Sequence, residues 1–249
     1  MNGTLNGKVA LVTGGSRGIG AATARGLAAE GADVAISYST SASKAEALVD
    51  ELRAKGVRAE AFQADQADPA QVDRLVKTVV ERFGRLDILV NNAGVAAAAP
   101  VDHPINGSSE LDRLYAVNVF GVVGAIRAAA QVMGEGGRII SIGSCLGAHT
   151  PFPCVANYSA TTSAIVGYTR GAARDLGPKG ITVNVVQPGP IDTEMNPADG
   201  ATAPPQKAAT AMGRYGRPEE VAAAVCFLAR PEASYITGTA LDVDGGFGA

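Results

Sequence analysis

The stretch Thr13-Gly14-Gly15-Ser16-Arg17-Gly18-Ile19-Gly20 follows the apolar run Val9-Ala10-Leu11-Val12 and leads into a segment of helical composition. Glycines permit a tight turn and a close approach of the backbone to a ligand. The amino end of the following helix offers free N–H groups and a positive dipole end, and both suit a pyrophosphate. A strand, a glycine-rich turn and a helix in this order predict a dinucleotide site. The alternative is a glycine turn that serves only tight packing of the helix on the strand.

Short β-branched runs alternate with longer amphipathic segments along the rest of the chain. We expect strands at residues 9–13, 33–37, 58–62, 86–90, 138–142, 181–186 and 240–243. We expect helices near residues 18–31, 43–55, 69–83, 108–133, 157–176 and 218–229. This alternation predicts an α/β protein, a single Rossmann domain over residues 1–249 with a seven-stranded parallel sheet and helices on both faces. The Pro-, Ala- and Gly-rich segment 188–218 is too long for an ordinary connection, and we expect it to be a substrate lid.

The composition excludes several classes of function. Apolar residues make up 47% of the 249 residues, which excludes a disordered chain. A net charge of −3 gives no basic surface for nucleic acid or an anionic membrane. No apolar run approaches the roughly 18 residues needed to span a bilayer, and the first residues lack the features of a signal peptide. Three widely spaced cysteines favour reduced thiols. We therefore expect a cytoplasmic protein that binds neither nucleic acid nor membranes.

The spacing Gly-x-x-x-Gly-x-Gly from Gly14 to Gly20 resembles that of the short-chain dehydrogenase/reductase family. Further motifs typical of that family follow in its order along nearly the whole chain: Asn91-Asn92-Ala93-Gly94, Asn118, Ser144, Tyr158, Pro188 to Thr193, and Asp242 to Gly246. The resemblance implies a nicotinamide-dependent oxidoreductase. Within the family, the chain is most similar to 3-oxoacyl-carrier-protein reductases and related ketone reductases.

Three of these residues suit carbonyl chemistry. Reduction of a ketone needs a hydride at carbon and a proton at oxygen, and the phenol of Tyr158 can donate that proton directly. Ser144, at the end of the expected fifth strand, can donate a second hydrogen bond to the oxygen as negative charge develops on it. The resemblance implies that Asn118 holds a water molecule in a proton relay. The alternatives are a tyrosine that only packs, a serine that only caps, and a mid-helix asparagine that is already satisfied.

Thr162 departs from the family pattern, which has a lysine four residues after the catalytic tyrosine. Residues four apart share a helix face, so residue 162 is expected beside Tyr158. In the family this lysine bonds the nicotinamide ribose and lowers the pKa of the tyrosine. A threonine carries no charge, and no lysine lies between Lys77 and Lys179. Because Tyr158 and Ser144 are intact, the pattern favours a reductase with one isolated substitution and impaired or altered catalysis. The alternatives are a cofactor-binding regulatory or structural family member, and an epimerase or dehydratase on the same fold.

The expected second strand ends at Ser37-Tyr38-Ser39-Thr40, without the acidic residue that an NAD-preferring site places on the adenosine ribose. Arg17 and Lys44 offer positive charge that suits a 2′-phosphate, so we expect NADP(H) as the cofactor. The alternative for Arg17 is a solvated side chain. We expect no metal. The resemblance implies that Asp65 contacts the adenine and that the turn from Pro188 to Thr193 holds the nicotinamide end. Together with the glycine turn, it implies that these residues line the cofactor: Gly14, Ser16, Arg17, Gly18, Ile19, Gly20, Tyr38, Ser39, Asp65, Gln66, Asn91, Ala93, Gly94, Tyr158, Pro188, Gly189, Ile191 and Thr193.

Small and apolar residues are expected to wall the substrate site: Ala96 to Ala99, Cys145, Leu146, Phe152, Pro153, Pro190 and Met195, with His149 near the mouth. The stretch Gly134 to Arg138 lacks the basic cluster that carrier-protein reductases often show. A free hydrophobic or aryl ketone is therefore at least as well supported as a 3-oxoacyl chain. The segments 108–133 and 157–176 carry more small residues than one core-facing stripe requires, and family members commonly form a four-helix interface there. We therefore expect a homotetramer.

Overall fold

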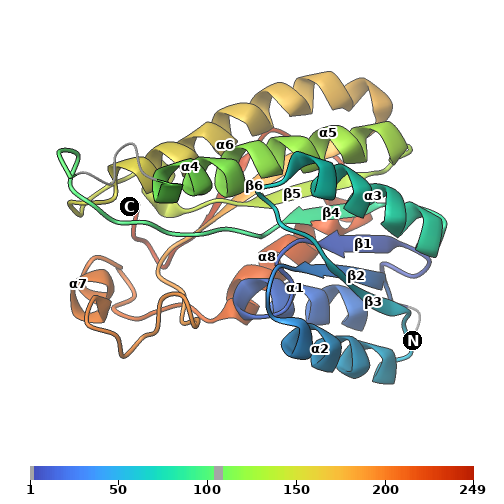
Figure 1. The fold of residues 1–249 in the computed structure, drawn as a ribbon, viewed down its shortest axis with the longest axis horizontal. Helices are drawn as coiled ribbons and strands as arrows, with labels where there is room; N and C mark the ends of the chain where they lie inside the picture. Colours follow the sequence, from blue (N-terminus) through green and yellow to red (C-terminus); the bar gives the residue numbers. More distant parts are fainter. Residues whose placement is uncertain (1–2, 104–108) are drawn as a thin grey trace.

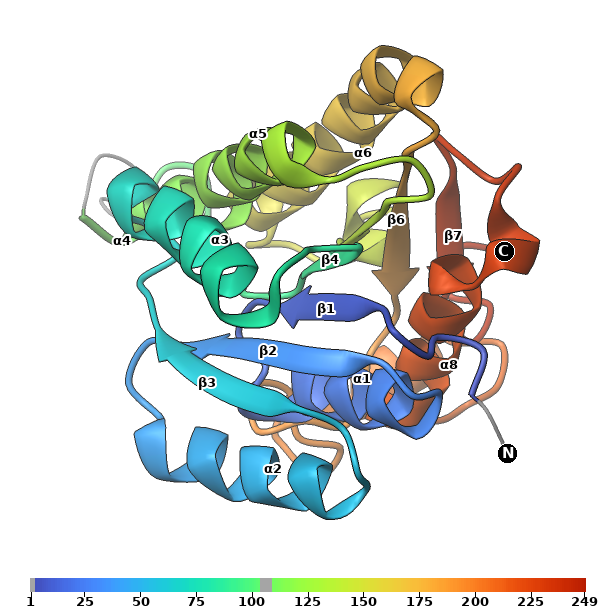
Figure 2. The ribbon, with the colours of Figure 1, turned by 90° about the vertical axis from the view of Figure 1, so that its right-hand side faces the viewer.

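A parallel sheet runs through the middle of the molecule and is covered by helices on both faces (Figure 1, Figure 2). The computed structural model describes residues 3–103 and 109–249. Its seven strands are all parallel and follow the order β3-β2-β1-β4-β5-β6-β7, which confirms the predicted sheet. The strands are β1 (Val9–Val12), β2 (Asp33–Tyr38), β3 (Ala59–Gln63), β4 (Ile88–Asn91), β5 (Arg138–Ile142), β6 (Thr182–Pro188) and β7 (Ala240–Val243).

Three long helices cover each face of the sheet (Figure 2). One face carries α1 (Gly18–Ala29), α2 (Ala42–Ala54) and α8 (Pro218–Ala229), and the other carries α3 (Pro69–Phe83), α5 (Val122–Val132) and α6 (Ala156–Leu176). The shorter elements are α4 (Ser109–Tyr115), η1 (Ala116–Gly121), η2 (Cys145–Gly147), η3 (Gly177–Lys179), α7 (Ala203–Ala208) and η4 (Pro231–Ala233). The predicted helices are confirmed, and most of their first and last residues agree with the structure to within two residues. The expected start at Ser108 lies outside the described residues.

Successive side chains of each strand enter opposite cores, which is why the strands are apolar at nearly every position. In β1, Ala10 and Val12 pack with α1 and α8, while Val9 and Leu11 pack with α3 and α5. The strand order reverses direction between β1 and β4. In open sheets of this kind, ligands bind in the crevice at the carboxyl ends of the strands beside such a reversal. The fold therefore places the expected site at the ends of β1 and β4.

The helix expected over residues 108–133 differs from the prediction in its middle, where the π-helical segment η1 separates α4 from α5. Gly121 lies so close to Gln66 that a Cβ there would overlap the backbone oxygen of Gln66. The widened turn thus accompanies a tight contact with the loop after β3.

By length and composition alone, the helical stretch Ser109–Val132 is apolar enough to cross a membrane. In its most apolar 18-residue stretch, 39% is buried inside the protein. A core helix meets the same criteria, and α5 places Ile126 in the core beside α3.

Segment 188–218 has more regular structure than the loop that its composition predicts. It contains α7, and in Figure 1 it forms the orange lobe that carries this helix. Its two ends pair with each other, because Gly216 N donates to Pro190 O and Asp192 N donates to Gly216 O, both at 2.9 Å. Met212 N also donates to Gly245 O of the C-terminal loop at 3.0 Å. The segment is therefore anchored at its base and at the C terminus.

Candidate active site

The carboxyl ends of β1 and β4 are tied together by a polar cluster around Thr13. The Thr13 hydroxyl accepts hydrogen bonds from the backbone N–H groups of Asn92 and Ala93, each at 3.1 Å. The Asn92 side-chain amide donates to the backbone oxygens of Thr13 and Gly14, both at 3.0 Å. A Cβ on Gly14 would lie 2.8 Å from the Ala93 Cα, so only glycine fits there. The glycine turn and the motif after β4 are thereby brought side by side.

The amino end of α1 fits a phosphate group. The helix starts at Gly18, which has φ +53°, and the preceding Arg17 makes no side-chain cap. No acidic residue stands in the first turn, so the positive end of the helix dipole meets no anionic side chain of that turn. A Cβ on Gly20 would overlap the Asn92 side chain, so glycine lets α1 begin this close to β4. The residues present therefore fit the predicted pyrophosphate site.

Arg17 and Lys44, the two cations predicted to meet a 2′-phosphate, converge on the carboxylate of Glu194. Arg17 Nη1 lies 3.2 Å from Glu194 Oε2, and Lys44 Nζ lies 2.7 and 2.9 Å from the two carboxylate oxygens. All three side chains are about half exposed. Hydrogen bonding to Lys44, followed by the pairing with Arg17, holds the pKa of Glu194 below its usual value. Arg17 is therefore ion-paired rather than merely solvated, and Glu194 is a site residue that the motifs did not reveal.

Residues expected at the adenosine end of the cofactor gather where β2 and β3 finish. Tyr38 ends β2, and Ser39 follows it. After β3, the Asp65 carboxylate is held by the Arg113 guanidinium through both oxygens at 3.1 Å, and this pairing lowers the pKa of Asp65. Gln66 is buried, and among residues 3–103 and 109–249 its side-chain nitrogen has no hydrogen-bond partner. Both Asp65 oxygens are held by Arg113 and the Gln66 nitrogen is buried, so the adenine contact expected here stays a prediction.

Segment 188–193 lies against both the glycine turn and the C-terminal loop. A Cβ placed on Gly18 would lie 3.4 Å from the Thr193 methyl group. A Cβ on Gly189 would lie 2.6 Å from the backbone oxygen of Asp244, so glycine is required at this close approach. The predicted phosphate-binding turn and the predicted nicotinamide-end turn are therefore neighbours. The remaining predicted residues of these turns and strand ends are Ser16, Ile19, Gly94, Pro188 and Ile191.

Two asparagines predicted in the site donate hydrogen bonds within the protein through their side-chain nitrogens. Asn91 is buried and donates to Ser141 Oγ at 3.3 Å, which braces β4 against β5. Asn118 in η1 pairs with the backbone of Val95, donating to Val95 O at 2.9 Å and accepting from Val95 N at 3.0 Å. Its Nδ2 also lies 3.4 Å from the Thr161 hydroxyl. In this structure both side chains position the loops around the site, and the water-holding role expected of Asn118 stays a prediction.

Ser144 and Tyr158 are brought together at the carboxyl end of β5. Ser144 caps η2 by accepting from the Leu146 N–H at 3.2 Å. Ser159 and Ser163 fasten α6 to this turn by donating to its backbone oxygens at 2.6 and 2.7 Å. Burial raises the pKa of Tyr158 above its usual value, and the hydrogen bond from Ser144 opposes this rise. The pair offers two hydroxyl donors at one point, which is the arrangement that a developing oxyanion requires.

Thr162 lies against the same turn but directs its hydroxyl onto its own helix. Thr162 is 5% exposed, and its Oγ1 donates to the backbone oxygens of Ser159 at 3.0 Å and Tyr158 at 3.4 Å. A Cβ on Gly147 would lie 3.0 Å from Thr162 Oγ1, so the packing here is tight. The single hydroxyl proton is thus used within α6. Within residues 3–103 and 109–249, the groups that shift the pKa of Tyr158 include no cation.

Aromatic rings gather on the side of the site expected to face the substrate. The ring of Phe247, near the C terminus, contacts those of His149 and Phe152, with centroid distances of 6.0 and 5.8 Å. The 96–99 loop meets the chain just before α6, because Ala99 N donates to Cys154 O at 2.8 Å. The structure therefore clusters several of the predicted walls and adds Phe247, which no sequence motif marks.

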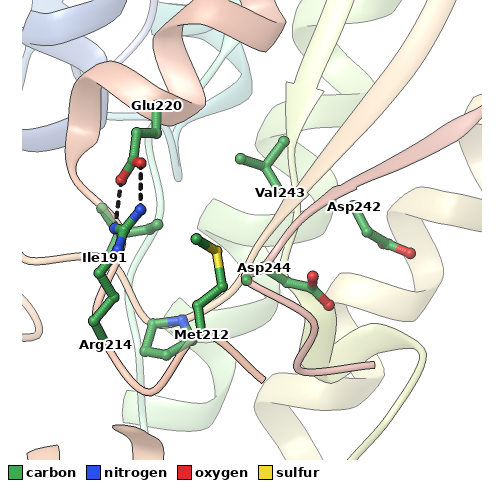
Figure 3. Close-up of a pocket in the computed structure, with 10 residues that line it drawn as sticks. Ile191, Met212, Arg214, Glu220, Asp242, Val243 and Asp244 are labelled. Carbon is green, nitrogen blue, oxygen red and sulfur yellow. Dashed lines mark hydrogen bonds and ion pairs between the residues drawn. The ribbon is translucent and has the colours of Figure 1, made fainter. Parts of the chain in front are cut away.

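A cavity of about 220 Å³ lies behind segment 188–218 (Figure 3). Residues of this segment and Asp242 to Gly245 bound it, and the ion pair between Arg214 and Glu220, at 2.7 and 2.9 Å, lies at its wall. Ser144 and Tyr158 do not line it, whereas Pro190 and Ile191 of the predicted site do. Within the described parts of the chain, no cluster of three or more His, Cys, Asp or Glu side chains could hold a metal ion.

Comparison with known proteins gives matches over almost the whole chain. The family model described as enoyl-(acyl carrier protein) reductase matches residues 14–248. The chain is 44% identical over 247 residues to the cyclic-di-GMP-binding biofilm dispersal mediator protein of Escherichia coli, covering 99% of this chain and 100% of that protein. It is 42% identical over 248 residues to a 3-oxoacyl-[acyl-carrier-protein] reductase of Synechocystis, covering 97% of each. A short chain dehydrogenase from Burkholderia cenocepacia, solved in complex with NADP, matches with a TM-score of 0.96 and 53% identity, covering 99% of this chain and 100% of that chain.

Proposed function

The chain belongs to the short-chain dehydrogenase/reductase family, and from that premise we propose that it reduces a ketone to a secondary alcohol, with Tyr158 as proton donor and Ser144 as the group that stabilises the carbonyl oxygen. It is an oxidoreductase of this family that uses NADP(H). The observation that carries the proposal is that Ser159 and Ser163 bind α6 to η2, which places Tyr158 beside Ser144 at the carboxyl end of β5. This end of the sheet is also where the phosphate-fitting turn lies.

The hydride that the carbonyl carbon receives would come from NADPH, when it is bound. The Tyr158 phenol gives its proton to the carbonyl oxygen, and the Ser144 hydroxyl donates a hydrogen bond to the same oxygen as it becomes negative. The fastening of α6 to η2 by Ser159 and Ser163 holds the two donors in one orientation before substrate arrives. Without a neighbouring ammonium, Tyr158 is reprotonated from water. In this proposal Asn118 serves as a positioning residue through Val95.

Two substitutions test this assignment by the rate of NADPH oxidation with a panel of hydrophobic, aryl and 3-oxoacyl ketones. Tyr158→Phe removes the proton donor and should lower kcat at least a hundredfold, the scale of general acid catalysis. Ser144→Ala should also lower kcat at least a hundredfold, the scale of an oxyanion donor. Both variants should retain NADPH affinity within a fewfold. Unchanged kcat in Tyr158→Phe would overturn the proposal.

The cofactor preference is assigned to Arg17 and Lys44, which we propose bind the 2′-phosphate of NADP(H). Both cations already converge on one anionic group, and β2 ends at Tyr38 without an acid. NADPH should therefore bind more tightly than NADH when dissociation constants are measured by fluorescence at matched salt. Arg17→Ala should weaken NADPH and leave NADH nearly unchanged. A preference that Arg17→Ala does not alter would exclude this role.

We propose a hydrophobic ketone as the substrate class, either a 3-oxoacyl chain or a free hydrophobic or aryl ketone. The contact of the buried Phe247 ring with His149 and Phe152 supports apolar substrates, because it backs the expected wall with an aromatic side chain. Segment 188–218 would cover the bound substrate as a lid, since it lies against the glycine turn through Thr193. Product analysis with each ketone separates a reductase from an epimerase or dehydratase.

A second candidate function is regulation through cofactor binding with little catalysis. Two observations favour it: Thr162 stands where the family has lysine, and the related Escherichia coli protein carries the name of a cyclic-di-GMP-binding dispersal mediator. Calorimetry with cyclic-di-GMP, set beside the ketone panel, separates the two candidates. Binding of that dinucleotide together with inactivity on every ketone, even in Thr162→Lys, would favour the regulatory function.

We propose that the protein acts as a homotetramer in the cytoplasm. Gly167 and Gly171 lie on the open side of α6, where an added Cβ would meet no atom of the described residues within 4 Å, and Phe120 of η1 is 62% exposed. Small residues permit close contact between helices, and an exposed aromatic side chain suits an interface. Light scattering at micromolar concentration should give four times the 25.1 kDa chain mass. A species of a single chain mass would exclude the tetramer.

A further inference from the structure

The carboxylate of Glu194 joins three parts of the chain that are far apart in sequence. It meets Arg17 of the glycine turn at 3.2 Å and Lys44 of the first turn of α2 at 2.7 Å. Glu194 itself belongs to segment 188–218. In the described part of the chain, Glu194 is the acidic partner that both cations share. One acid thus occupies the point where two cations meet.

A carboxylate and a phosphate make the same kind of contact with these cations. Both are anions with several oxygen acceptors, and both are bound by guanidinium and ammonium groups through charge-assisted hydrogen bonds. Two cations that converge on one carboxylate can therefore converge on a phosphate monoester in its place. They cannot satisfy both anions equally, because an anion that stays beside the phosphate repels it.

We propose that Glu194 occupies the anion site formed by Arg17 and Lys44 and is displaced by the 2′-phosphate when NADP(H) binds. Glu194 is then a determinant of cofactor selectivity, since it competes with NADP(H) and has no phosphate to compete with in NAD(H). This inference rests on the proposed role of Arg17 and Lys44 as 2′-phosphate ligands.

Displacement of Glu194 would also release one tether of segment 188–218. The preceding Thr193 packs on Gly18 and accepts a hydrogen bond from Asn196 N at 3.2 Å. The Asn196 side chain in turn donates to Gln206 of α7 at 2.9 Å. Contacts therefore run without a break from the phosphate site to α7, and loss of the Glu194 ion pairs loosens the near end of this path.

The substitution Glu194→Gln removes the competing charge and keeps the shape of the side chain. Fluorescence titration should show NADPH binding roughly two- to tenfold tighter, the scale expected for half-exposed ion pairs, and NADH binding changed less than twofold. The gain should shrink as salt is raised, because salt screens exposed charges. Glu46→Gln is the matched control, since it removes the same charge from an exposed position of α2 only two residues from Lys44. Unchanged or weaker NADPH binding in Glu194→Gln, or an equal gain in Glu46→Gln, would overturn the inference.

Arg17→Ala separates failure of this inference from failure of the cofactor assignment. If Arg17→Ala leaves NADPH affinity unchanged, the 2′-phosphate assignment itself is wrong. If Arg17→Ala weakens NADPH but Glu194→Gln does not strengthen it, only the displacement of Glu194 is wrong. Limited trypsin digestion of the cofactor-free protein gives a readout without activity. Cleavage after Lys207 in α7 should be faster in Glu194→Gln than in the unsubstituted protein or in Glu46→Gln, and equal rates would exclude the tether.

Discussion

Replacing Thr162 by lysine tests whether the missing charge controls the direction of the reaction. Tyr158 must be protonated to reduce a ketone and ionised to accept the proton of an alcohol. Burial raises the pKa of Tyr158 above its ordinary value of about 10, and no cation is among the groups that shift it. At neutral pH fewer than about one phenol in a thousand is then ionised. Ketone reduction therefore keeps its acid over the whole neutral range, while alcohol oxidation lacks its base until the pH is strongly alkaline.

The size of the effect depends on the distance between the lysine ammonium and the phenolate, for which the spacing of the two side chains gives the scale. Residues 158 and 162 stand one turn apart on α6, with about 5–6 Å between such Cβ atoms. An ammonium about 6 Å from the phenolate, at an effective dielectric constant of about 20, favours ionisation by ~2.8 kcal/mol, or about 2 pKa units. Thr162→Lys should therefore move the alkaline limb of alcohol oxidation down by about 2 pH units. Oxidation at neutral pH should rise about a hundredfold, and reduction should change far less.

The assay is the pH profile of kcat/KM in both directions, from neutral to strongly alkaline pH. Thr162→Met is the matched control, because it adds similar length at the tight contact with Gly147 without a charge. Only the lysine variant should shift the oxidation profile. Equal shifts in both variants would assign the effect to packing. An oxidation profile of the unsubstituted protein that already rises near neutral pH would show that another group supplies the charge, and the reasoning on Thr162 would be refuted.

Three further outcomes follow from the backbone and the thiols. Cys154 has φ +69°, so Cys154→Gly should raise the free energy of unfolding by about 0.5–1 kcal/mol in urea denaturation; a loss of stability would show that the cysteine side chain contributes more than the strain. Gly121→Ala should lower the free energy of unfolding by about 1–3 kcal/mol, because the added Cβ overlaps the backbone of the loop after β3. Gly124→Ala should not lower it, because no atom of the described residues would lie nearer than 3.8 Å to the added Cβ. Burial raises the pKa of Cys145 and of Cys226 to about 12, so a thiol reagent at mildly alkaline pH should label the exposed Cys154 first in the native protein. Equal labelling of all three would contradict the buried placement.

The sheet and the helices were predictable because their signals are local. Short β-branched runs predicted the seven strands, and longer amphipathic segments between them predicted the long helices. Glycine and proline mark many of the boundaries, and the predicted ends agree with the structure to within a few residues. The π-helical segment η1 has no such signal, since it accompanies the contact of Gly121 with the backbone of Gln66, more than fifty residues away. The pairing of the two ends of segment 188–218 is likewise a tertiary contact, which its Pro- and Gly-rich composition does not encode.

Some residues of the candidate site also carry a local sequence signal, whereas others are identified only by tertiary contacts. Ser144, Tyr158 and the glycine turn stand in motifs with fixed spacing, and the structure brings them to one edge of the sheet. Glu194 had no local pattern to mark it, because its ion pairs join it to residues 150 and 177 positions away. The direction of the Thr162 hydroxyl was within reach of sequence reasoning, since buried helical threonines commonly donate to carbonyls of the preceding turn.

Thr162 and Glu194 are expected to act on different parts of the cofactor. The effects of substituting them on NADPH and NADH affinity should therefore be separable. A lysine at position 162 would reach the nicotinamide end, which NADPH and NADH share, and should tighten both by the same factor. Glu194→Gln relieves competition only with the 2′-phosphate and should change the ratio between the two. Among the described residues, the hydrogen bonds of Thr162 and the ion pairs of Glu194 have no partner in common, so their effects should multiply in the double variant. A double variant whose NADPH affinity falls well short of that product would show that segment 188–218 couples the two ends of the cofactor.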